Sequence, residues 1–402
     1  MKILFVSYHY WPPHFGGELL ISIDRFKSLV ERGHQVIVLT SGNPGMPERE
    51  IVDGIEIRRS PIVGKSRFAR GLRRLVYSIW VRKQMRKLGY DVLHYANIGQ
   101  VGWLDGWISG KLTLGLNHKL GHKAVWVHSL SDTETEDFSN RGLQLKVRNR
   151  ILQLVDLIVS VGPRLNEAVQ KVFPDKAKEL VCGVRDDLFI PMSEEDKTNF
   201  RRQYGVLEND VVFSFLGSVG TRKGFDLLYK AFTEIEKETP SVKLWIAGPK
   251  SKQENQNLDD LEINQMIEKA EASDKIRFWG RIDDRQQLAK ILGASDAFVF
   301  PSRKEGFGIA PLEAMATGIP AIIAKIPGVT DLANVEGETG YYNDVNDAQA
   351  LKAAMVKMTL STENRSQMGE KARKRIVDNF GWQAHIDRWE ATYRALIDEE
   401  KR

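Results

Sequence analysis

The sequence predicts an α/β protein of two doubly wound domains, each built around a parallel sheet. The chain has 402 residues, which is too long for one ordinary hydrophobic core and suits two domains of roughly 200 residues each. Short apolar runs alternate with helical stretches in both halves, and this alternation is typical of parallel strands joined by right-handed crossovers. A polar stretch with Pro191 interrupts the alternation near the middle.

The first half contains six apolar runs of strand length and one clear helical pattern. The helical pattern covers residues 18–33 and ends at Gly33, which is a favourable C-terminal cap. The expected strands are residues 3–7, 35–40, 54–60, 91–95, 123–129 and 157–162.

The second half repeats this order after a boundary placed at residue 190. The expected strands are residues 211–217, 243–248, 276–280, 297–302 and 320–324, and the expected helices are 224–238, 284–295 and 347–360. Residues 380–402 form an amphipathic pattern with Trp382, Ile386, Trp389 and Tyr393 on one side. The sequence is therefore divided into domains 1–190 and 191–380 and a C-terminal helix, 381–402.

The composition excludes several classes of protein. With 42% apolar and 28% charged residues, it is that of a folded soluble protein. Cys182 is the only cysteine, which rules out an intramolecular disulfide and suggests a reducing, cytoplasmic compartment. The eight histidines show no ligand spacing, so no protein-held metal is expected. Neither a signal peptide nor a membrane-spanning run is expected, because the apolar stretches are too short.

The net charge of +5 conceals a strongly basic segment, residues 58–87, which holds eleven Lys and Arg residues and no acid. Within it, six apolar residues recur at helical spacing: Phe68, Leu72, Leu75, Val76, Ile79 and Trp80. One interpretation is a helix packed on the sheet with a solvated basic face. The other is docking on anionic lipid, and the two can coexist. No motif that reads nucleic acid is present, so nucleic acid is not an expected partner.

Two glycine-containing turns each follow a strand and precede a helix. In "PPHFGGE", Gly16 and Gly17 allow the backbone to approach a phosphate at a helix N-terminus. In "GSVGTRKGF", Arg222 and Lys223 lie between glycines and suit a pyrophosphate that gains charge as it leaves. The alternatives are an ordinary βα turn for the first and solvated basic residues for the second.

The stretch "PSRKEGFGIAPLEAMATGIPAI" carries two glutamates, Glu305 and Glu313. Glu305 falls in a loop in which Gly306 and Gly308 free backbone N–H groups to face a ligand. Pro311 is expected as the first residue of a short helix, which puts Glu313 in its first turn. The glutamates then share no helix face, and the alternative for Glu313 is a plain stabilising acid at a helix N-terminus.

Together these motifs resemble those of the retaining nucleotide-sugar glycosyltransferases with the GT-B fold, specifically glycosyltransferase family 4. The resemblance spans nearly the whole chain. It rests on "PPHFGGE", "VWVHS", "CGVRDDLFIP", "GSVGTRKGF", "IRFWGRID", "EGFGIAPLEAMATGIP" and "PGVTDL", in that order.

The resemblance implies a donor site facing a cleft between the domains, with each role assigned by position. Gly16 and Gly17 approach the donor phosphate, Lys223 contacts the pyrophosphate, and Ser218 and Arg222 belong to the same loop. Glu305 binds donor-sugar hydroxyls beside the backbone of Gly306, Phe307, Gly308 and Ile309. Glu313 accepts hydrogen bonds from the ribose, and Ile282 lies where the base is held. His128 lines the cleft near the donor sugar and acceptor, although a histidine that ends a buried strand is often only a core residue.

Several positions depart from the family pattern. Ser218 stands where arginine is usual, and Arg222 is the candidate substitute cation. The other departures are Cys182 for asparagine, Arg185 for aspartate, Asp331 for glutamate and Gly162 for serine.

The implied reaction is front-face transfer with retention, in which the departing phosphate accepts the acceptor's proton. Lys223, Arg222 and the loop amides replace a divalent metal, so no cofactor is expected. The expected partners are a nucleotide-sugar and a glycan or lipid-linked acceptor, in polysaccharide or cell-envelope synthesis. The final helix is expected to cross back to the N-terminal domain, as in similar enzymes. The rivals are a sugar-nucleotide epimerase on the same fold and a non-catalytic binding scaffold; a nicotinamide dehydrogenase is disfavoured because no G-x-G-x-x-G follows a strand.

Overall fold

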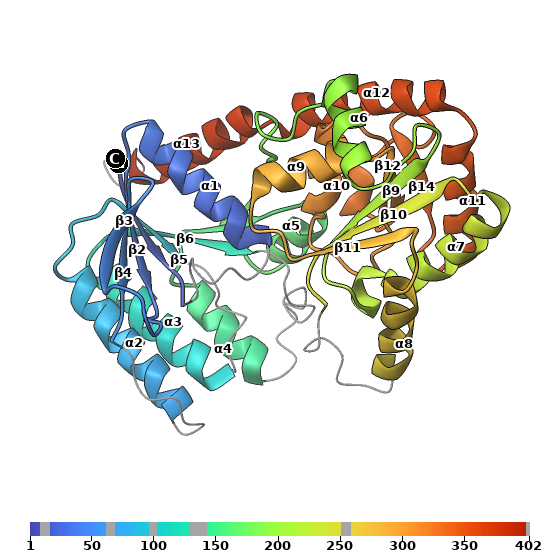
Figure 1. Ribbon diagram of the computed structural model, residues 1–402. Helices are drawn as coiled ribbons and strands as arrows, with labels where there is room; N and C mark the ends of the chain where they lie inside the picture. Colours follow the sequence, from blue (N-terminus) through green and yellow to red (C-terminus); the bar gives the residue numbers. More distant parts are fainter. Residues whose placement is uncertain (9–16, 62–68, 96–102, 129–142, 251–258, 399–402) are drawn as a thin grey trace. The chain divides into compact units, whose positions relative to one another are not determined.

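The computed structural model describes residues 1–8, 17–61, 69–95, 103–128, 143–250 and 259–398. It divides into two compact units (Figure 1). The first unit is Met1–Cys182 together with Gln383–Arg402, and the second is Gly183–Trp382. The prediction of two α/β units, each with a parallel sheet, is confirmed.

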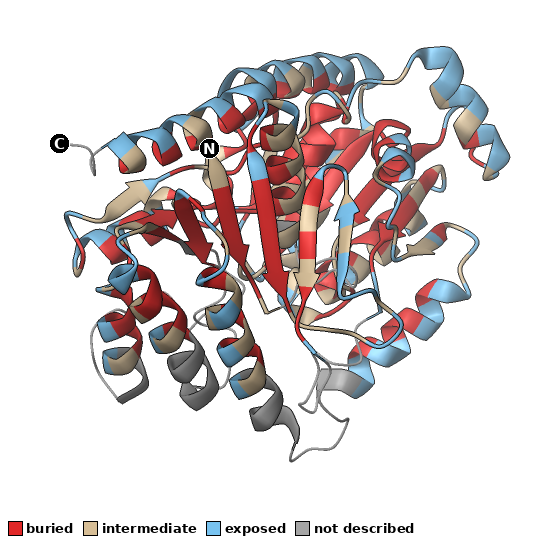
Figure 2. Cartoon of the chain, turned by 90° about the vertical axis from the view of Figure 1, so that its left-hand side faces the viewer, coloured by how far each residue is buried: buried red, intermediate tan, exposed pale blue. Residues whose placement is uncertain are grey.

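Within the described part of the first unit, eight strands form one sheet in the order β3-β4-β2-β1-β5-β6-β7-β8. The strands are β1 (Lys2–Val6), β2 (Gln35–Thr40), β3 (Arg49–Val52), β4 (Ile55–Arg59), β5 (Val92–Tyr95), β6 (Lys123–His128), β7 (Leu157–Ser160) and β8 (Ala177–Glu179). The central strands read as continuous apolar runs because helices cover both faces of a parallel sheet. Figure 2 shows the buried strands and the exposed outer sides of the helices.

The helices of the first unit lie on both faces of this sheet (Figure 1). They are α1 (Gly17–Glu31), α2 (Ala69–Met85), α3 (Trp103–Lys119), α4 (Leu143–Leu152), α5 (Pro163–Gln170) and α13 (Trp382–Asp398). Helix α2 packs against α3. Its Tyr77, Val81 and Met85 are buried at i, i+4 and i+8 and belong to the hydrophobic core of this unit. The Tyr77 hydroxyl donates to the Leu39 carbonyl at 3.0 Å.

The apolar stripe expected in the basic segment does not form one continuous buried face. Leu75 and Ile79 are 41% and 57% exposed, so they point away from the sheet. Val76 and Trp80 are half-buried, and Phe68 lies outside the described residues. Apolar residues cover a broad arc of the helix. The face that holds Tyr77 packs toward the core, and the face that holds Ile79 is exposed.

From Gln383 onward, helix α13 belongs to the first unit. Tyr393 Oη lies 2.6 Å from His94 Nδ1, and the Trp389 ring lies under the Arg25 guanidinium at 4.0 Å. Burial lowers the pKa of His94 well below its usual value, so the imidazole is neutral. At the surface, Glu390 accepts hydrogen bonds from Arg394 and Arg32, which lower its pKa to about 2. Helix α13 therefore joins the sheet by a buried aromatic contact and a peripheral charge network.

In the second unit, the described residues form a six-stranded parallel sheet in the order β11-β10-β9-β12-β13-β14. The strands are β9 (Val211–Leu216), β10 (Val242–Ala247), β11 (Ile276–Gly280), β12 (Ala297–Phe300), β13 (Ala321–Ala324) and β14 (Gly340–Asn343). The helices are α6 (Glu194–Gln203), α7 (Phe225–Glu238), α8 (Asp259–Glu271), α9 (Arg285–Gly293), α10 (Ile309–Ala316), α11 (Ala348–Thr359) and α12 (Thr362–Phe380), with single 3₁₀ turns η2 (Thr221–Lys223) and η3 (Thr330–Leu332).

One core of the second unit lies between the sheet and helices α7, α8 and α11, and a smaller cluster lies on the side of α6 and α9. Residues after Cys182 belong to this unit because they are bound to α12 and to Trp382, the last residue of the unit. The Trp382 N–H donates to Asp186 at 2.7 Å, and Arg373 donates to the carbonyls of Asp186 and Phe189.

Three strands were not expected from the sequence. Strand β3 pairs antiparallel with β4, and its Arg-Glu-Ile-Val sequence alternates between exposed and half-buried residues at the edge of the sheet. Strands β8 and β14 form further edges, with three and four residues. Short edge strands contain few apolar residues in a recognisable pattern, because each has a neighbouring strand on one side only and is more open to water.

Candidate functional site

The predicted donor residues of the second unit lie in the segments that follow the carboxyl ends of β9, β11 and β12, and two of them, Ile309 and Glu313, lie in α10. Strands β9 and β12 are neighbours in the sheet. The loop that holds Gly217 to Lys223 therefore leaves the sheet beside the loop that holds Glu305. Loops of this kind are where parallel α/β sheets bind ligands.

Lys223 and Glu305 form an ion pair across these two loops. Lys223 Nζ lies 2.5 Å from Glu305 Oε1, and the two side chains are 16% and 9% exposed. The Lys223 ammonium also lies 5.3 Å from the centre of the Phe300 ring. Ser302 donates its hydroxyl to the same Glu305 oxygen at 2.6 Å. The carboxylate is thus held by an ammonium and a hydroxyl and shielded from water, which strengthens both contacts.

Arg222 lies next to this pair but is more open to solvent. Its guanidinium is 4.0 Å from Glu305 Oε1, donates to the Lys304 carbonyl at 3.3 Å, and is 46% exposed. Ser218 is half-buried in the same loop. The structure therefore places a second cation beside Glu305, contributed by Arg222 from the end of the loop that begins at Gly217.

The Gly-Phe-Gly segment turns the chain from the Glu305 loop into α10. Gly308 has φ of 85°, in the left-handed region that glycine favours, and is the N-cap of the helix. Phe307 is buried, with its ring 5.9 Å from that of Phe380. The Phe307 side chain thus packs into the core of the unit and holds the loop in place. What residues 306–308 can offer a ligand is therefore their backbone.

Helix α10 begins at Ile309, not at Pro311 as expected. Proline is tolerated at the third helical position because the first four N–H groups of a helix have no partner within it. Glu313 is consequently the fifth residue of the helix, in its second turn and not in its first. The expectation that Glu305 lies outside the helix is correct.

Glu313 binds a cation that the sequence did not single out. Arg285 Nη2 lies 2.9 Å from Glu313 Oε1, and the side chains are 21% and 12% exposed. Arg285 opens α9 after the N-cap Asp284, and its guanidinium lies 5.2 Å from the centre of the Phe189 ring. Ile282, three residues earlier, packs on the cluster beside α6 and α9. The segment after β11 and the start of α10 are therefore linked by the Arg285–Glu313 pair.

The remaining predicted residues belong to the first unit. His128 is the last residue of β6 and pairs in register with Ser160 of β7. Gly17 is the first residue of α1, and Gly16 lies outside the described residues.

Sequence reasoning missed Ser302, Arg285 and the ion pair of Arg303 with Asp226. The only signal for them is their position beside predicted loop residues, because polar pairs between distant loops leave no periodic pattern. Among the residues described, no group of three or more His, Cys, Asp or Glu side chains could hold a metal ion.

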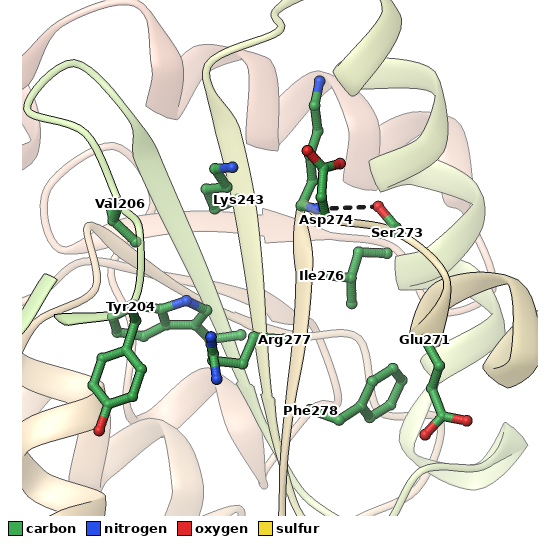
Figure 3. A pocket seen from close by; sticks show the side chains of 11 residues that line it. Tyr204, Val206, Lys243, Glu271, Ser273, Asp274, Ile276, Arg277 and Phe278 are labelled. Atoms are coloured by element: carbon green, nitrogen blue, oxygen red, sulfur yellow. Dashed lines mark hydrogen bonds between the residues drawn. The ribbon is translucent and has the colours of Figure 1, made fainter. Parts of the chain in front are cut away.

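A pocket of about 370 Å³ lies elsewhere on the second unit, at the edge strand β11 (Figure 3). Arg277 lies beside Tyr204, with its guanidinium 4.9 Å from the ring centre. Lys243 and Lys275, at the amino ends of β10 and β11, also line the pocket. None of the predicted donor residues lines it, and it lies toward the amino ends of these strands, away from the candidate loops.

Comparisons with known proteins agree with this architecture. The family model described as "Glycosyl transferases group 1" matches residues 196–375, and that described as "Glycosyltransferase Family 4" matches residues 26–188. N-acetyl-alpha-D-glucosaminyl L-malate synthase of Bacillus anthracis is 24% identical over 396 residues, which cover 97% of this chain and 96% of that protein.

Two solved structures share the fold. Sucrose-phosphate synthase from Thermosynechococcus elongatus superposes with a TM-score of 0.80 at 22% identity, over 99% of each chain. HepE from Anabaena, in complex with UDP-glucose, superposes with a TM-score of 0.75 at 18% identity, over 98% of this chain and 100% of that one.

Proposed function

Because the chain belongs to glycosyltransferase family 4, a group 1 glycosyltransferase family with the GT-B fold, we propose that it is a retaining hexosyltransferase. It takes the sugar from a UDP- or GDP-linked donor and transfers it to a hydroxyl of a glycan or a lipid-linked acceptor. Glycosyltransferase activity with a nucleotide-sugar follows from the family. The configuration, the acceptor and a role in envelope polysaccharide synthesis are the proposed parts. The UDP-glucose bound to HepE supports UDP-glucose as a first donor to test.

The Lys223–Glu305 pair is the observation that carries this proposal. It puts a shielded cation and a shielded carboxylate 2.5 Å apart at the ends of two neighbouring strands. Lys223, with Arg222 beside it, suits the charge that develops on a departing diphosphate, and Glu305 suits donor-sugar hydroxyls. Each cation or donor aimed at such a charge contributes on the order of 3 kcal/mol in other enzymes.

In the proposed reaction, the bond between the anomeric carbon and the phosphate oxygen breaks as the acceptor oxygen bonds to that carbon from the same face. The acceptor's proton passes to the departing phosphate, which leaves as the nucleoside diphosphate. Lys223 and Arg222 stabilise the leaving charge, and Glu313 holds the ribose. His128 lies beside the donor sugar and acceptor, Gly16 and Gly17 approach the phosphate, and no metal takes part. The chain's task is positioning and charge stabilisation.

Two variants test this assignment. Lys223→Ala and Glu305→Ala should each abolish transfer from the active donor, which is first identified by screening UDP- and GDP-sugars for turnover and thermal stabilisation. Lys304→Ala is the matched control, because its side chain makes no hydrogen bond or ion pair within the described residues. Near-normal turnover by either of the first two variants would remove the assignment. Donor binding without turnover by the unaltered protein would favour the scaffold instead.

We also propose that the enzyme works as a cytoplasmic protein on the inner, anionic face of a membrane, through the basic segment 58–87. The exposed Leu75 and Ile79 lie on the same stripe of α2 as the exposed Lys83, and the exposed Arg86 directly follows the helix. An apolar pair bordered by cations suits the boundary of an anionic bilayer. Among the described helices, none is long and apolar enough to cross a membrane.

Flotation with liposomes tests this surface. Binding should require anionic lipid, weaken with salt, and fall in Ile79→Gln and in Lys83→Glu. Ile51→Gln is the control, because Ile51 is 69% exposed but lies on the edge strand β3. An absence of binding at low salt would refute the membrane proposal without affecting the donor site.

A further inference from the structure

We propose that Arg303 is a positioning residue, which sets the separation of Lys223 and Glu305 by tying the two loops together. This inference rests on the proposed function and deepens it. Arg303 lies two residues before Glu305, and its side chain reaches the other loop. Its guanidinium donates to both carboxylate oxygens of Asp226 at 2.7 Å and to the carbonyl of Thr221, two residues before Lys223.

The Arg303 side chain is largely shielded from water, and all three nitrogens of its guanidinium donate hydrogen bonds. Its side chain is 23% exposed and that of Asp226 is 14% exposed. Its Nε donates to Asn346 Oδ1 at 2.5 Å, and Asn346 holds a left-handed backbone with φ of 68°. One side chain thus binds the η2 turn, the first turn of α7 and the loop before α11. Lysine cannot replace such a planar set of donors.

The backbone repeats this connection over consecutive residues. The Arg303 N–H donates to the Arg222 carbonyl at 2.9 Å, and the Ser302 hydroxyl lies 3.2 Å from the same carbonyl. A Cβ at Gly224 would lie 2.1 Å from the Pro301 carbonyl oxygen, so these segments touch directly. The short segment 301–305 therefore contacts the other loop at both of its ends, through Pro301 against Gly224 and through Glu305 with Lys223. These contacts fix the position of Lys223 relative to Glu305.

Small displacements at such a site have large effects, because a shift of about 1 Å in a reacting geometry can reduce a rate by about 100-fold. Arg303 touches neither the Lys223 ammonium nor the Glu305 carboxylate in any contact that the structure describes. Its effect must pass through the loops. A residue that acts in this way loses its influence once the side chain it positions has been removed.

The test combines amide hydrogen exchange with nucleotide binding. In Arg303→Lys, the amides of Arg303 and Gly224 should exchange at least tenfold faster, and Asp226→Asn should reproduce this change. UDP affinity, or GDP affinity if the protein prefers it, should fall about tenfold in Arg303→Lys. In a Lys223→Ala background the same substitution should change affinity less than twofold, because Lys223 is then no longer there to be positioned.

Arg365→Lys is the matched control. Arg365 is 8% exposed and donates to the Met358 carbonyl and the Thr362 hydroxyl at the junction of α11 and α12. It should lower the melting temperature but leave UDP affinity within twofold. Three results would each overturn the proposal. The amides could exchange at an unchanged rate in Arg303→Lys, they could exchange faster while the UDP affinity stays the same, or Arg303→Lys could lower the UDP affinity equally with and without Lys223. Failure of the unaltered protein to bind either nucleotide would instead overturn the proposed function, and the role of Arg303 with it.

Discussion

Replacing Glu313 by glutamine tests whether this carboxylate binds the ribose of the donor. Glutamine keeps the size and one oxygen acceptor but removes the charge. A hydrogen bond to a charged group contributes about 1.5–3 kcal/mol, and each 1.4 kcal/mol is about a tenfold change in affinity. Because Glu313 is only 12% exposed, water compensates little of this loss. UDP should therefore bind Glu313→Gln about 10- to 100-fold more weakly.

The same substitution also removes the ion-pair partner of Arg285. The effect of losing this pair has to be separated from the effect of losing the hydrogen bond to the ribose. Arg285 is 21% exposed and Glu313 is 12% exposed, so the cost of breaking this pair lies between the about 0.2–1 kcal/mol of an exposed pair and the about 3–5 kcal/mol of a buried one. Calorimetric titration of UDP and 2′-deoxy-UDP into both proteins separates the effects as a double-mutant cycle. The missing hydroxyl should weaken binding about tenfold in the unaltered protein and less than threefold in Glu313→Gln.

Arg285→Gln is the control, since it removes the cation and leaves the carboxylate in place. It should keep the normal discrimination between UDP and 2′-deoxy-UDP. If the loss caused by the deoxy nucleotide is the same with and without the Glu313 carboxylate, then Glu313 does not bind the ribose, and the reasoning is refuted.

Three stability predictions follow from the second unit and α13, each measured by denaturant unfolding. Gly224→Ala should cost more than about 2 kcal/mol, since its φ is 74° and its Cβ would lie 2.1 Å from the Pro301 oxygen. Gly205→Ala, with φ of 70° in open space, should cost only about 1 kcal/mol, and equal losses would contradict the steric argument. Asp296→Asn should cost about 3 kcal/mol at pH 7: burial raises the pKa of this carboxyl, but Lys197, Arg201 and the Val212 N–H outweigh burial and lower it. This contribution is complete above the ordinary aspartate pKa of about 3.9 and is lost as the pH falls through the lowered value, so the variant should lose less stability on acidification. Trp389→Ala should cost about 3–5 kcal/mol in the transition of the first unit, because this ring is 2% exposed; a loss below about 1 kcal/mol would mean that α13 does not depend on it.

The sequence was sufficient for the strands at the centre of each sheet and insufficient at the edges. Residues 3–6 are all apolar, and residues 211–216 are apolar except for Ser214, because helices cover both faces of their strands. Edge strands such as β3 alternate weakly and were missed. The sequence also left open which face of α2 packs inward, for a related reason. Both Ile79 and Tyr77 belong to a broad apolar arc, and only the packing on α3 and the Leu39 carbonyl selects Tyr77.

In the candidate site, the residue types were predictable and their partners were not. Lys223 and Glu305 were each singled out by glycines and by a recognisable motif, yet their contact joins residues that are 82 positions apart. It depends on β9 and β12 being neighbours, which a strand order inferred from alternation alone does not specify. The partners Ser302, Arg285 and Arg303 had no signal of their own, since a polar residue in a loop looks the same whether it is solvated or bound.

The start of α10 changes what Glu313 can do. Had the helix begun at Pro311, the Glu313 carboxylate would lie among the unpaired N–H groups of the first turn, where an acid is commonly held as part of the helix end. Because the helix begins at Ile309, Glu313 lies beyond that turn, and the charge it meets is Arg285 of α9. Its carboxylate is thus bound by a side chain from another element. A carboxylate oriented in this way is suited to accepting hydrogen bonds from a ligand, and the cation that orients it lies three residues after Ile282, in the segment expected to hold the base. The two glutamates of "EGFGIAPLE" therefore each contact a cation from a distant segment of the chain, Glu305 that of Lys223 in the η2 turn and Glu313 that of Arg285 in α9, and the Gly308 turn lies between them.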